Sequence, residues 1–199
     1  LNLTVGAVCV YHALVETAAK AHKGSNIPVA AVSTGFPHGL SPLPRRIEEI
    51  GDSVSAGALE IDIVITRAHV FSGNWEALFQ EIKSFREACG DSHLKTILGT
   101  GELGSLRNVA KASLVCMMAG ADFIKTSTGK EPQNATLPVS LVMMRMIRDY
   151  HQKTGHKVGF KPAGGIRTAK QALEWQILVK EELGREWLEP KLFRFGASG

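Results

Sequence analysis

The stretch Lys157-Val-Gly-Phe-Lys-Pro-Ala-Gly-Gly-Ile-Arg-Thr-Ala169 passes from a short apolar run, through a glycine turn, to the start of a helical pattern. Its apolar residues predict a buried strand, and its adjacent glycines predict a tight turn. Thr168 is a suitable N-cap for a helix over 169–183, where apolar residues recur at helical spacing. A strand, a turn and a helix in this order make one βα unit, from which parallel sheets are built.

Comparable units recur along the whole chain. Helical periodicity is also found over 75–86 and 137–150, and no low-complexity linker divides the 199 residues. We therefore expect one α/β domain over residues 1–199, with seven parallel strands and six helices. The seven apolar runs are Val5–Val10, Val29–Ser33, Glu60–Ile65, Leu94–Leu98, Asp122–Thr126, Lys157–Lys161 and Leu192–Gly196.

Two architectures fit this alternation of strands and helices. A doubly wound open sheet usually has about five or six strands, whereas a (β/α)8 TIM barrel has eight strands in about 250 residues. Seven strands in 199 residues favour a TIM barrel that lacks its first βα unit and its last helix. In such a barrel, the residues at the C-terminal ends of the strands form the active site.

Lysines end two neighbouring apolar runs. Lys125 lies in Asp122-Phe-Ile-Lys-Thr-Ser-Thr-Gly129, and Lys161 takes the same place on the next predicted strand. Lysine is rarely buried without a partner or a function. Burial and a second ammonium group lower the pKa of a lysine and make its amine a nucleophile toward carbonyl groups. The pair therefore indicates Schiff-base chemistry; the alternative is that both side chains extend to solvent from the strand ends.

An aspartate lies inside a third apolar run, Glu60-Ile-Asp-Ile-Val64. A buried carboxylate needs a partner, and near two lysines Asp62 can accept and return protons during imine chemistry. A purely structural ion pair is the alternative. Lys95, on the next predicted strand, is either the partner of this carboxylate or a substrate contact.

Glycine turns at two consecutive strand ends predict an anion-binding site. The first turn contains Gly164, Gly165, Ile166 and Arg167, and the second contains Gly196 and Ser198. The first leads into a helix N-terminus, whose amides bind phosphate, and its arginine adds a fixed charge. Barrels commonly bind phosphate with the loops after their last two strands. The alternative is that these glycines only form tight turns. The residues that follow Lys125 add further hydroxyls, amides and a positive charge that can bind an anion. They are Thr126, Ser127, Thr128, Gly129 and Lys130.

Composition narrows the classes of function. The 23 basic and 19 acidic residues give a net charge of +4 without a basic stripe interleaved with aromatic residues, which argues against nucleic acid as a partner. No apolar run approaches the roughly 20 residues that span a bilayer, so we expect no membrane association. The three cysteines are widely spaced, which favours reduced thiols in a cytoplasmic protein over disulfides or zinc. We expect Cys9, at the end of the first predicted strand, to be a buried structural residue; a place at the site is the alternative.

Taken together, these motifs resemble the deoxyribose-phosphate aldolase family in its animal form. The likeness covers nearly the whole chain, and the two lysine motifs carry most of its specificity. It implies a class I aldolase on a (β/α)8 barrel that cleaves 2-deoxy-D-ribose 5-phosphate to D-glyceraldehyde 3-phosphate and acetaldehyde, with no metal or other cofactor. The motifs are Thr34-Gly-Phe-Pro-His38, Glu60-Ile-Asp-Ile-Val64, Leu94-Lys-Thr-Ile97, Asp122-Phe-Ile-Lys-Thr-Ser-Thr-Gly129 and Gly159-Phe-Lys-Pro-Ala-Gly-Gly-Ile-Arg167.

The resemblance also implies roles for single residues. Lys125 resembles the Schiff-base lysine, Lys161 the second lysine that lowers its pKa, Asp62 the proton-relay acid and Lys95 a supporting lysine. The partner implied is a small phosphorylated sugar, and a homo-oligomer stays open. A non-catalytic phosphosugar-binding or interaction protein on the same fold is the alternative hypothesis. Contacts to substrate and phosphate are implied for Cys9, Thr128, Gly129, Lys130, Gly164, Gly165, Ile166, Arg167, Gly196 and Ser198.

Overall fold

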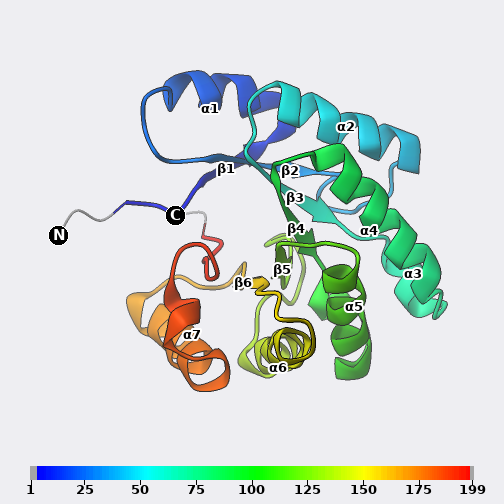
Figure 1. Ribbon diagram of the computed structural model, residues 1–199, viewed down its shortest axis with the longest axis vertical. Helices are drawn as coiled ribbons and strands as arrows, with labels where there is room; N and C mark the ends of the chain where they lie inside the picture. The colour runs from blue at the N-terminus through cyan, green and yellow to red at the C-terminus, as the bar shows by residue number, and fades with distance from the viewer. Residues whose placement is uncertain (1–3, 198–199) are drawn as a thin grey trace.

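The computed structural model describes residues 4–197. Its centre is a curved, wholly parallel six-stranded sheet in which each strand pairs with the next one along the chain (Figure 1). Sequential parallel order of this kind is the arrangement of an α/β barrel. The strands are β1 (Val8–Tyr11), β2 (Val29–Ser33), β3 (Glu60–Val64), β4 (His93–Ile97), β5 (Phe123–Lys125) and β6 (Gly159–Lys161).

Helices lie outside the curved sheet, between successive strands (Figure 1). The α-helices are α1 (Val15–Ala21), α2 (Leu43–Ser55), α3 (Arg67–Phe71), α4 (Trp75–Cys89), α5 (Leu106–Met118), α6 (Leu137–Thr154) and α7 (Ala169–Leu183). Three short 3-10 helices are η1 (His12–Leu14), η2 (Thr100–Glu102) and η3 (Arg185–Leu188). None of the helices within residues 4–197 combines the length and the apolar character needed to cross a membrane.

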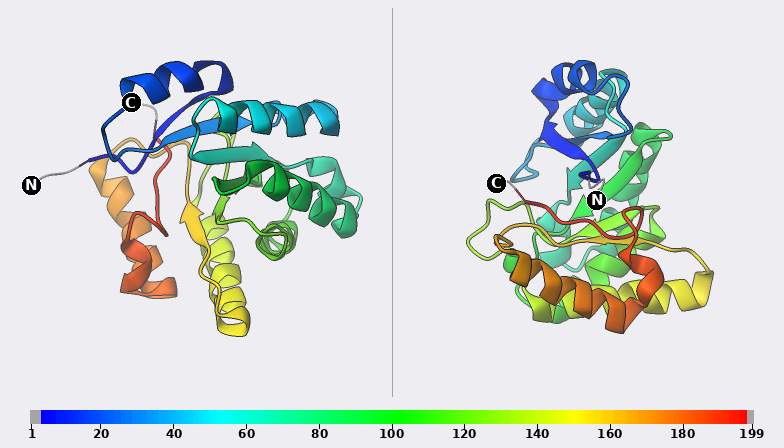
Figure 2. Two further views of the ribbon diagram at one scale, coloured as in Figure 1. Left: turned by 45° about the horizontal axis from the view of Figure 1, so that its top comes forward. Right: turned by 90° about the vertical axis from the view of Figure 1, so that its left-hand side faces the viewer.

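The predicted seventh strand is only partly formed. Leu192–Gly196 makes two isolated parallel bridges, Phe160 to Phe193 and Ala163 to Gly196, in place of a continuous ladder. Figure 2 shows this segment, in red, running back beside β6. Among the described strands, β1 has a ladder partner on one side only. The expected barrel-type order of parallel strands is confirmed, but six strands and one bridged segment are found where seven strands were predicted. The expected six helices became seven α-helices, because a short helix precedes the long one that starts at Trp75.

Burial on both faces explains the composition of the central strands. All five residues of β3 are buried, and Ile61 and Ile63 have no exposed surface. Alternate residues of a strand point to opposite faces of the sheet, so Glu60 and Asp62 share the face turned away from those isoleucines. The acidic side chains therefore point into the enclosed space of the curved sheet, where they need ionic partners.

The helix after β6 begins as the sequence indicates. The Thr168 hydroxyl accepts a hydrogen bond from the Gln171 amide, and the Gln171 side chain accepts one from the Thr168 amide. This reciprocal pair is a capping box, which satisfies amides that a helix start leaves unpaired. It fixes the point at which the glycine turn after β6 becomes α7.

Candidate active site

Two lysines face each other at the ends of β5 and β6. Lys125 and Lys161 are paired in the register of the parallel ladder, so the backbone itself places them side by side. Their side chains are only 5% and 8% exposed. The alternative that both extend to solvent is therefore wrong.

Both lysines share one carboxylate oxygen. Lys125 Nζ lies 2.8 Å and Lys161 Nζ lies 2.7 Å from Oδ2 of Asp62, which has no exposed surface. Lys95 Nζ donates to the other oxygen, Oδ1, at 2.9 Å. The sequence-predicted group of three lysines and one aspartate is thus brought together inside the sheet.

The carboxylate of Asp62 is held ionised by its surroundings. Burial raises the pKa of a carboxyl group, but the ammonium groups of Lys125, Lys161 and Lys95 outweigh burial and keep the pKa of Asp62 well below its usual range. The carboxylate of Asp62 is therefore the common partner of three lysine side chains.

The surroundings shift the pKa values of Lys125 and Lys161 in opposite directions. Burial and the charge of Lys161 lower the pKa of Lys125, despite the opposing effect of Asp62. Burial also acts to lower the pKa of Lys161, but Asp62, Cys9 and Glu60 outweigh it, and this pKa is raised. The lowered pKa favours Lys125 as the nucleophilic amine, and the raised pKa favours Lys161 as a proton donor.

A cavity of about 670 Å³ opens above these lysines at the carboxyl ends of the strands. It is lined by Cys9, Val10, Tyr11, Val32, Phe36, Lys125, Thr128, Gly129, Lys130, Asn134, Lys161, Ala163, Gly164, Gly165, Ile166, Arg167, Gly196 and Ala197. Nearly every residue predicted to touch substrate lies on this surface. Asp62 and Lys95 lie beneath the lysines, and Ser198 lies outside the described residues.

The glycine turns form one end of the cavity. Gly164 and Gly165 have φ of +81° and +85°, a conformation in which other residues are strained. A Cβ at Gly164 would lie 2.6 Å from Cγ of Asn134, whereas the space beside Gly165 is open. The turn therefore needs glycine for close packing at one position and presents bare backbone at the next.

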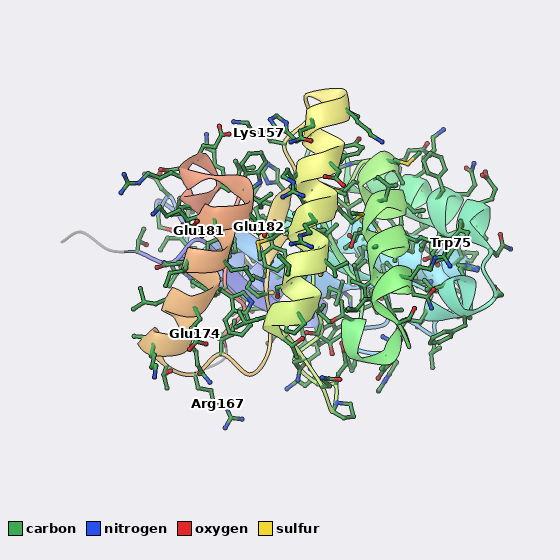
Figure 3. All side chains as sticks on the ribbon, turned by 90° about the horizontal axis from the view of Figure 1, so that it is seen from below. Trp75, Lys157, Arg167, Glu174, Glu181 and Glu182 are labelled. Atoms are coloured by element: carbon green, nitrogen blue, oxygen red, sulfur yellow. The ribbon has the colours of Figure 1, made fainter. Side chains whose placement is uncertain are left out.

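Part of the expected phosphate site is occupied by the protein itself. The amides of Arg167 and Thr168, at the start of α7, both donate to Oε1 of Gln171, at 2.8 and 3.1 Å. The amide of Thr128 likewise donates to Glu131 at 2.7 Å. The helix start is thus a weaker anion site than the sequence indicated. In Figure 3 the side chain of Arg167 projects from the N-terminal end of α7, away from the body of the domain.

Cys9 is not buried as expected. The residue is exposed and lines the cavity, so the prediction of a buried structural cysteine was wrong. Its strand, β1, has no neighbour on the side away from β2 among the described strands, which leaves that position uncovered.

Sequence reasoning missed an aromatic wall of the cavity. Tyr11 and Phe36 pack edge to face, with ring centroids 5.7 Å apart, and both line the cavity. The motif Thr34-Gly-Phe-Pro-His38 was a signal for Phe36. No sequence signal marked Tyr11, whose role depends on a neighbour 25 positions away along the chain.

No group of three or more histidine, cysteine, aspartate or glutamate side chains that could hold a metal ion is found within residues 4–197. Paired lysines on one carboxylate, at the carboxyl edge of a barrel-type parallel sheet and beside a glycine-lined cavity, are an arrangement typical of Schiff-base aldolases. The chain belongs to the DeoC/LacD family of aldolases, whose sequence model matches residues 1–182.

Known proteins resemble the chain over nearly its full length. The deoxyribose-phosphate aldolase of Mus musculus is 66% identical over 199 residues, a match that covers 99% of this chain and 63% of the mouse protein. The chain thus spans less than two thirds of that relative.

The similarity of the chain to solved structures shows that it has a TIM-barrel-type α/β fold. A Toxoplasma gondii structure has a TM-score of 0.86 at 22% identity, covering 96% of this chain and 76% of that one. The tetrameric deoxyribose phosphate aldolase of Aeropyrum pernix has a TM-score of 0.72 at 22% identity, covering 96% of this chain and 73% of that one.

Proposed function

We propose that the protein cleaves 2-deoxy-D-ribose 5-phosphate to D-glyceraldehyde 3-phosphate and acetaldehyde through an imine on Lys125. The observation that carries this proposal is the sharing of one Asp62 oxygen by Lys125 and Lys161, at 2.8 and 2.7 Å, with their pKa values driven apart. A protein that only binds phosphosugars has no use for a buried lysine whose pKa is lowered beside a second lysine whose pKa is raised. The geometry therefore favours catalysis over the non-catalytic alternative.

The first half of the reaction makes the imine. The neutral amine of Lys125 adds to the C1 aldehyde of the open-chain sugar and gives a carbinolamine. Lys161, whose pKa is raised, then delivers a proton to the hydroxyl group, which leaves as water. The resulting iminium is a cation at the place where Lys125 was neutral, and the adjacent carboxylate of Asp62 stabilises it.

The second half breaks the bond between C2 and C3. A base removes the proton from the C3 hydroxyl, the C2–C3 electron pair moves into the iminium, and C3 to C5 leave as glyceraldehyde 3-phosphate. The enamine that remains takes a proton at C2, and water releases acetaldehyde and the free amine. The Asp62 carboxylate and Lys161 are the groups within reach for these proton transfers.

The glycine turns hold the other end of the substrate. In this proposal the phosphate lies against the bare backbone at Gly165 and Ile166, with Gly129, Lys130 and Gly196 on the same cavity surface. Fixing the phosphate orients C1 toward Lys125 and makes the attack effectively intramolecular. We also propose that the reaction needs no metal or cofactor, because the imine itself accepts the electrons.

Reductive trapping tests the proposal. Borohydride added with acetaldehyde should convert the imine to a stable N-ethyl group on Lys125, which peptide mass spectrometry locates. Lys125→Arg should abolish the adduct, while Lys157→Met, at an exposed lysine paired with Glu186, should leave it unchanged. Binding of phosphate esters without any adduct on Lys125 would instead support the phosphosugar-binding alternative.

Assembly and location stay proposals. A homo-oligomer is favoured by the tetrameric structure of the Aeropyrum pernix relative, and size-exclusion chromatography with light scattering tests it. A cytoplasmic location is favoured by the three free cysteines, and fractionation of cells tests it.

A further inference from the structure

A second layer of ion pairs lies beneath the site carboxylate. Lys95, whose side chain is 1% exposed, lies between two acids, with Nζ 2.9 Å from Asp62 Oδ1 and 2.6 Å from Glu60 Oε2. The other oxygen of Glu60, Oε1, lies 3.1 Å from Nη2 of Arg194. The pairs form a continuous chain of contacts from the imine lysine to Arg194.

Arg194 belongs to the segment whose end, Gly196 and Ala197, lines the cavity beside the glycine turn. Its own amide donates to the Phe160 carbonyl at 3.2 Å, and two residues later the amide of Gly196 donates to the Pro162 carbonyl at 2.9 Å. Gly196 and Ala197 then line the cavity beside the glycine turn after β6, where the Gly164 amide donates to the Gly196 carbonyl at 3.4 Å. Arg194 is therefore two residues away from the cavity wall.

Backbone hydrogen bonds hold this segment on one side only. Four of them link Leu192, Arg194 and Gly196 to residues 160–164, and among the described residues none links the segment to β1. Phe193 stacks on Phe160, with ring centroids 6.4 Å apart, on one side. On the other side the guanidinium of Arg194, 14% exposed, reaches across to Glu60 on β3, 134 positions earlier in the chain. The ion pair is a specific, directional anchor that apolar packing does not provide.

We propose that Arg194 and Glu60 are positioning residues that hold the wall formed by Gly196 and Ala197 at the distance required for the substrate phosphate. Neither side chain is among those that line the cavity. The inference rests on the proposed function, because it assigns the phosphate of that substrate to this wall. It adds a role for two residues that lie below the reacting atoms.

The test separates an effect on phosphate binding, seen in KM and in the Ki of phosphate, from an effect on the reaction itself, seen in kcat. Arg194→Met should raise KM for 2-deoxyribose 5-phosphate about tenfold, or about 1.4 kcal/mol, with kcat changed less than twofold. The Ki of inorganic phosphate as a competitive inhibitor should rise by the same factor. With unphosphorylated 2-deoxyribose, kcat/KM should change less than twofold, which general loss of structure would not produce.

Two further variants complete the design. Arg194→Lys, which keeps the charge, should recover most of the lost affinity for phosphate. Adding Glu60→Gln to Arg194→Met should raise KM no further, because the anchor is already broken. An unchanged phosphate Ki in Arg194→Met, or an equal loss with both sugars, would overturn the proposal. If Arg194→Met does not fold, Arg194→Gln, which removes the charge but keeps a polar side chain, takes its place: a phosphate Ki above twice that of the parent protein without loss of kcat supports the anchor, and an unchanged value opposes it.

Failure of this inference is distinguishable from failure of the proposed function. Trapping of acetaldehyde on Lys125 needs no phosphate, so it reports imine formation whether or not Arg194 acts as an anchor. A trapped adduct with an unchanged phosphate Ki rejects the anchor alone. An absent adduct in the parent protein rejects the aldolase proposal itself.

Discussion

Removal of the second site lysine should slow imine formation by a calculable factor. The Nζ atoms of Lys125 and Lys161 lie 2.8 and 2.7 Å from the same oxygen of Asp62, so they are no more than about 5.5 Å apart. At an effective dielectric constant of about 20, two unit charges at that distance repel by about 3 kcal/mol. Lys161→Met removes this repulsion and leaves Asp62 free to bind the charged form of Lys125 more strongly.

The sign of the effect follows directly. The pKa of Lys125 rises in Lys161→Met, so less of the amine is neutral at pH 7. An energy of about 3 kcal/mol corresponds to about a hundredfold fall in the neutral fraction, and in the rate of imine formation. The acidic limb of the pH profile moves to higher pH. The rate of borohydride trapping with acetaldehyde recovers as the solution is made alkaline.

The assay is the initial rate of borohydride trapping on Lys125 between pH 5 and 10. Trapping is preferable to turnover because it does not depend on the later proton transfers that Lys161 also serves. Lys161→Arg is the matched control: it keeps the charge and should keep the acidic limb near its original pH. An identical acidic limb in Lys161→Met and Lys161→Arg would refute the argument that the second charge activates Lys125.

Three further outcomes are expected. Asp62→Asn removes the carboxylate that Lys125 and Lys161 share and one of the two carboxylates that hold Lys95, so it should lower the free energy of unfolding by about 3–5 kcal/mol at pH 7 in urea titrations. Because the pKa of Asp62 is lowered in the folded protein, its stabilising effect is present above the usual aspartate pKa of about 4 and is lost below it, so the difference between the two proteins should shrink on acidification; a constant difference would contradict the linkage. Gly164→Ala crowds a neighbouring side chain at a φ of +81° and should raise KM for the phosphorylated sugar, as steady-state kinetics would show. Ellman's reagent should label Cys9 in the native protein and label Cys89 and Cys116 only after unfolding, since burial raises both of their pKa values to about 12; three labelled thiols in the native state would be inconsistent with this fold.

The strands and the lysine pair were predictable from sequence because their signals are local. Each central strand is a compact run of β-branched and apolar residues, and each ends at a glycine turn or a polar residue. Lys125 and Lys161 stand at equivalent places in successive runs, and parallel pairing puts equivalent places side by side. The assignment of Asp62 to the same interior needed only the alternation of strand faces.

Other features depend on contacts that no local pattern encodes. The pairing of Glu60 with Arg194 joins residues 134 positions apart, and nothing near either one indicates it. The exposure of Cys9 depends on which strand covers β1, whereas its apolar neighbours resemble those of any buried strand. The last predicted strand has a suitable alternation of residues, but Arg194 turns to its ionic partner and only two bridges form.

The way the site is built also bears on how it can be altered. Lys125 and Lys161 are fixed by the ladder between β5 and β6, while Gly129, Gly164 and Gly165 lie in loops that follow those strands. Recognition and chemistry are therefore carried by separate parts of the backbone. Mutant libraries confined to the loops can search for new acceptor aldehydes while the reactive amine keeps its environment.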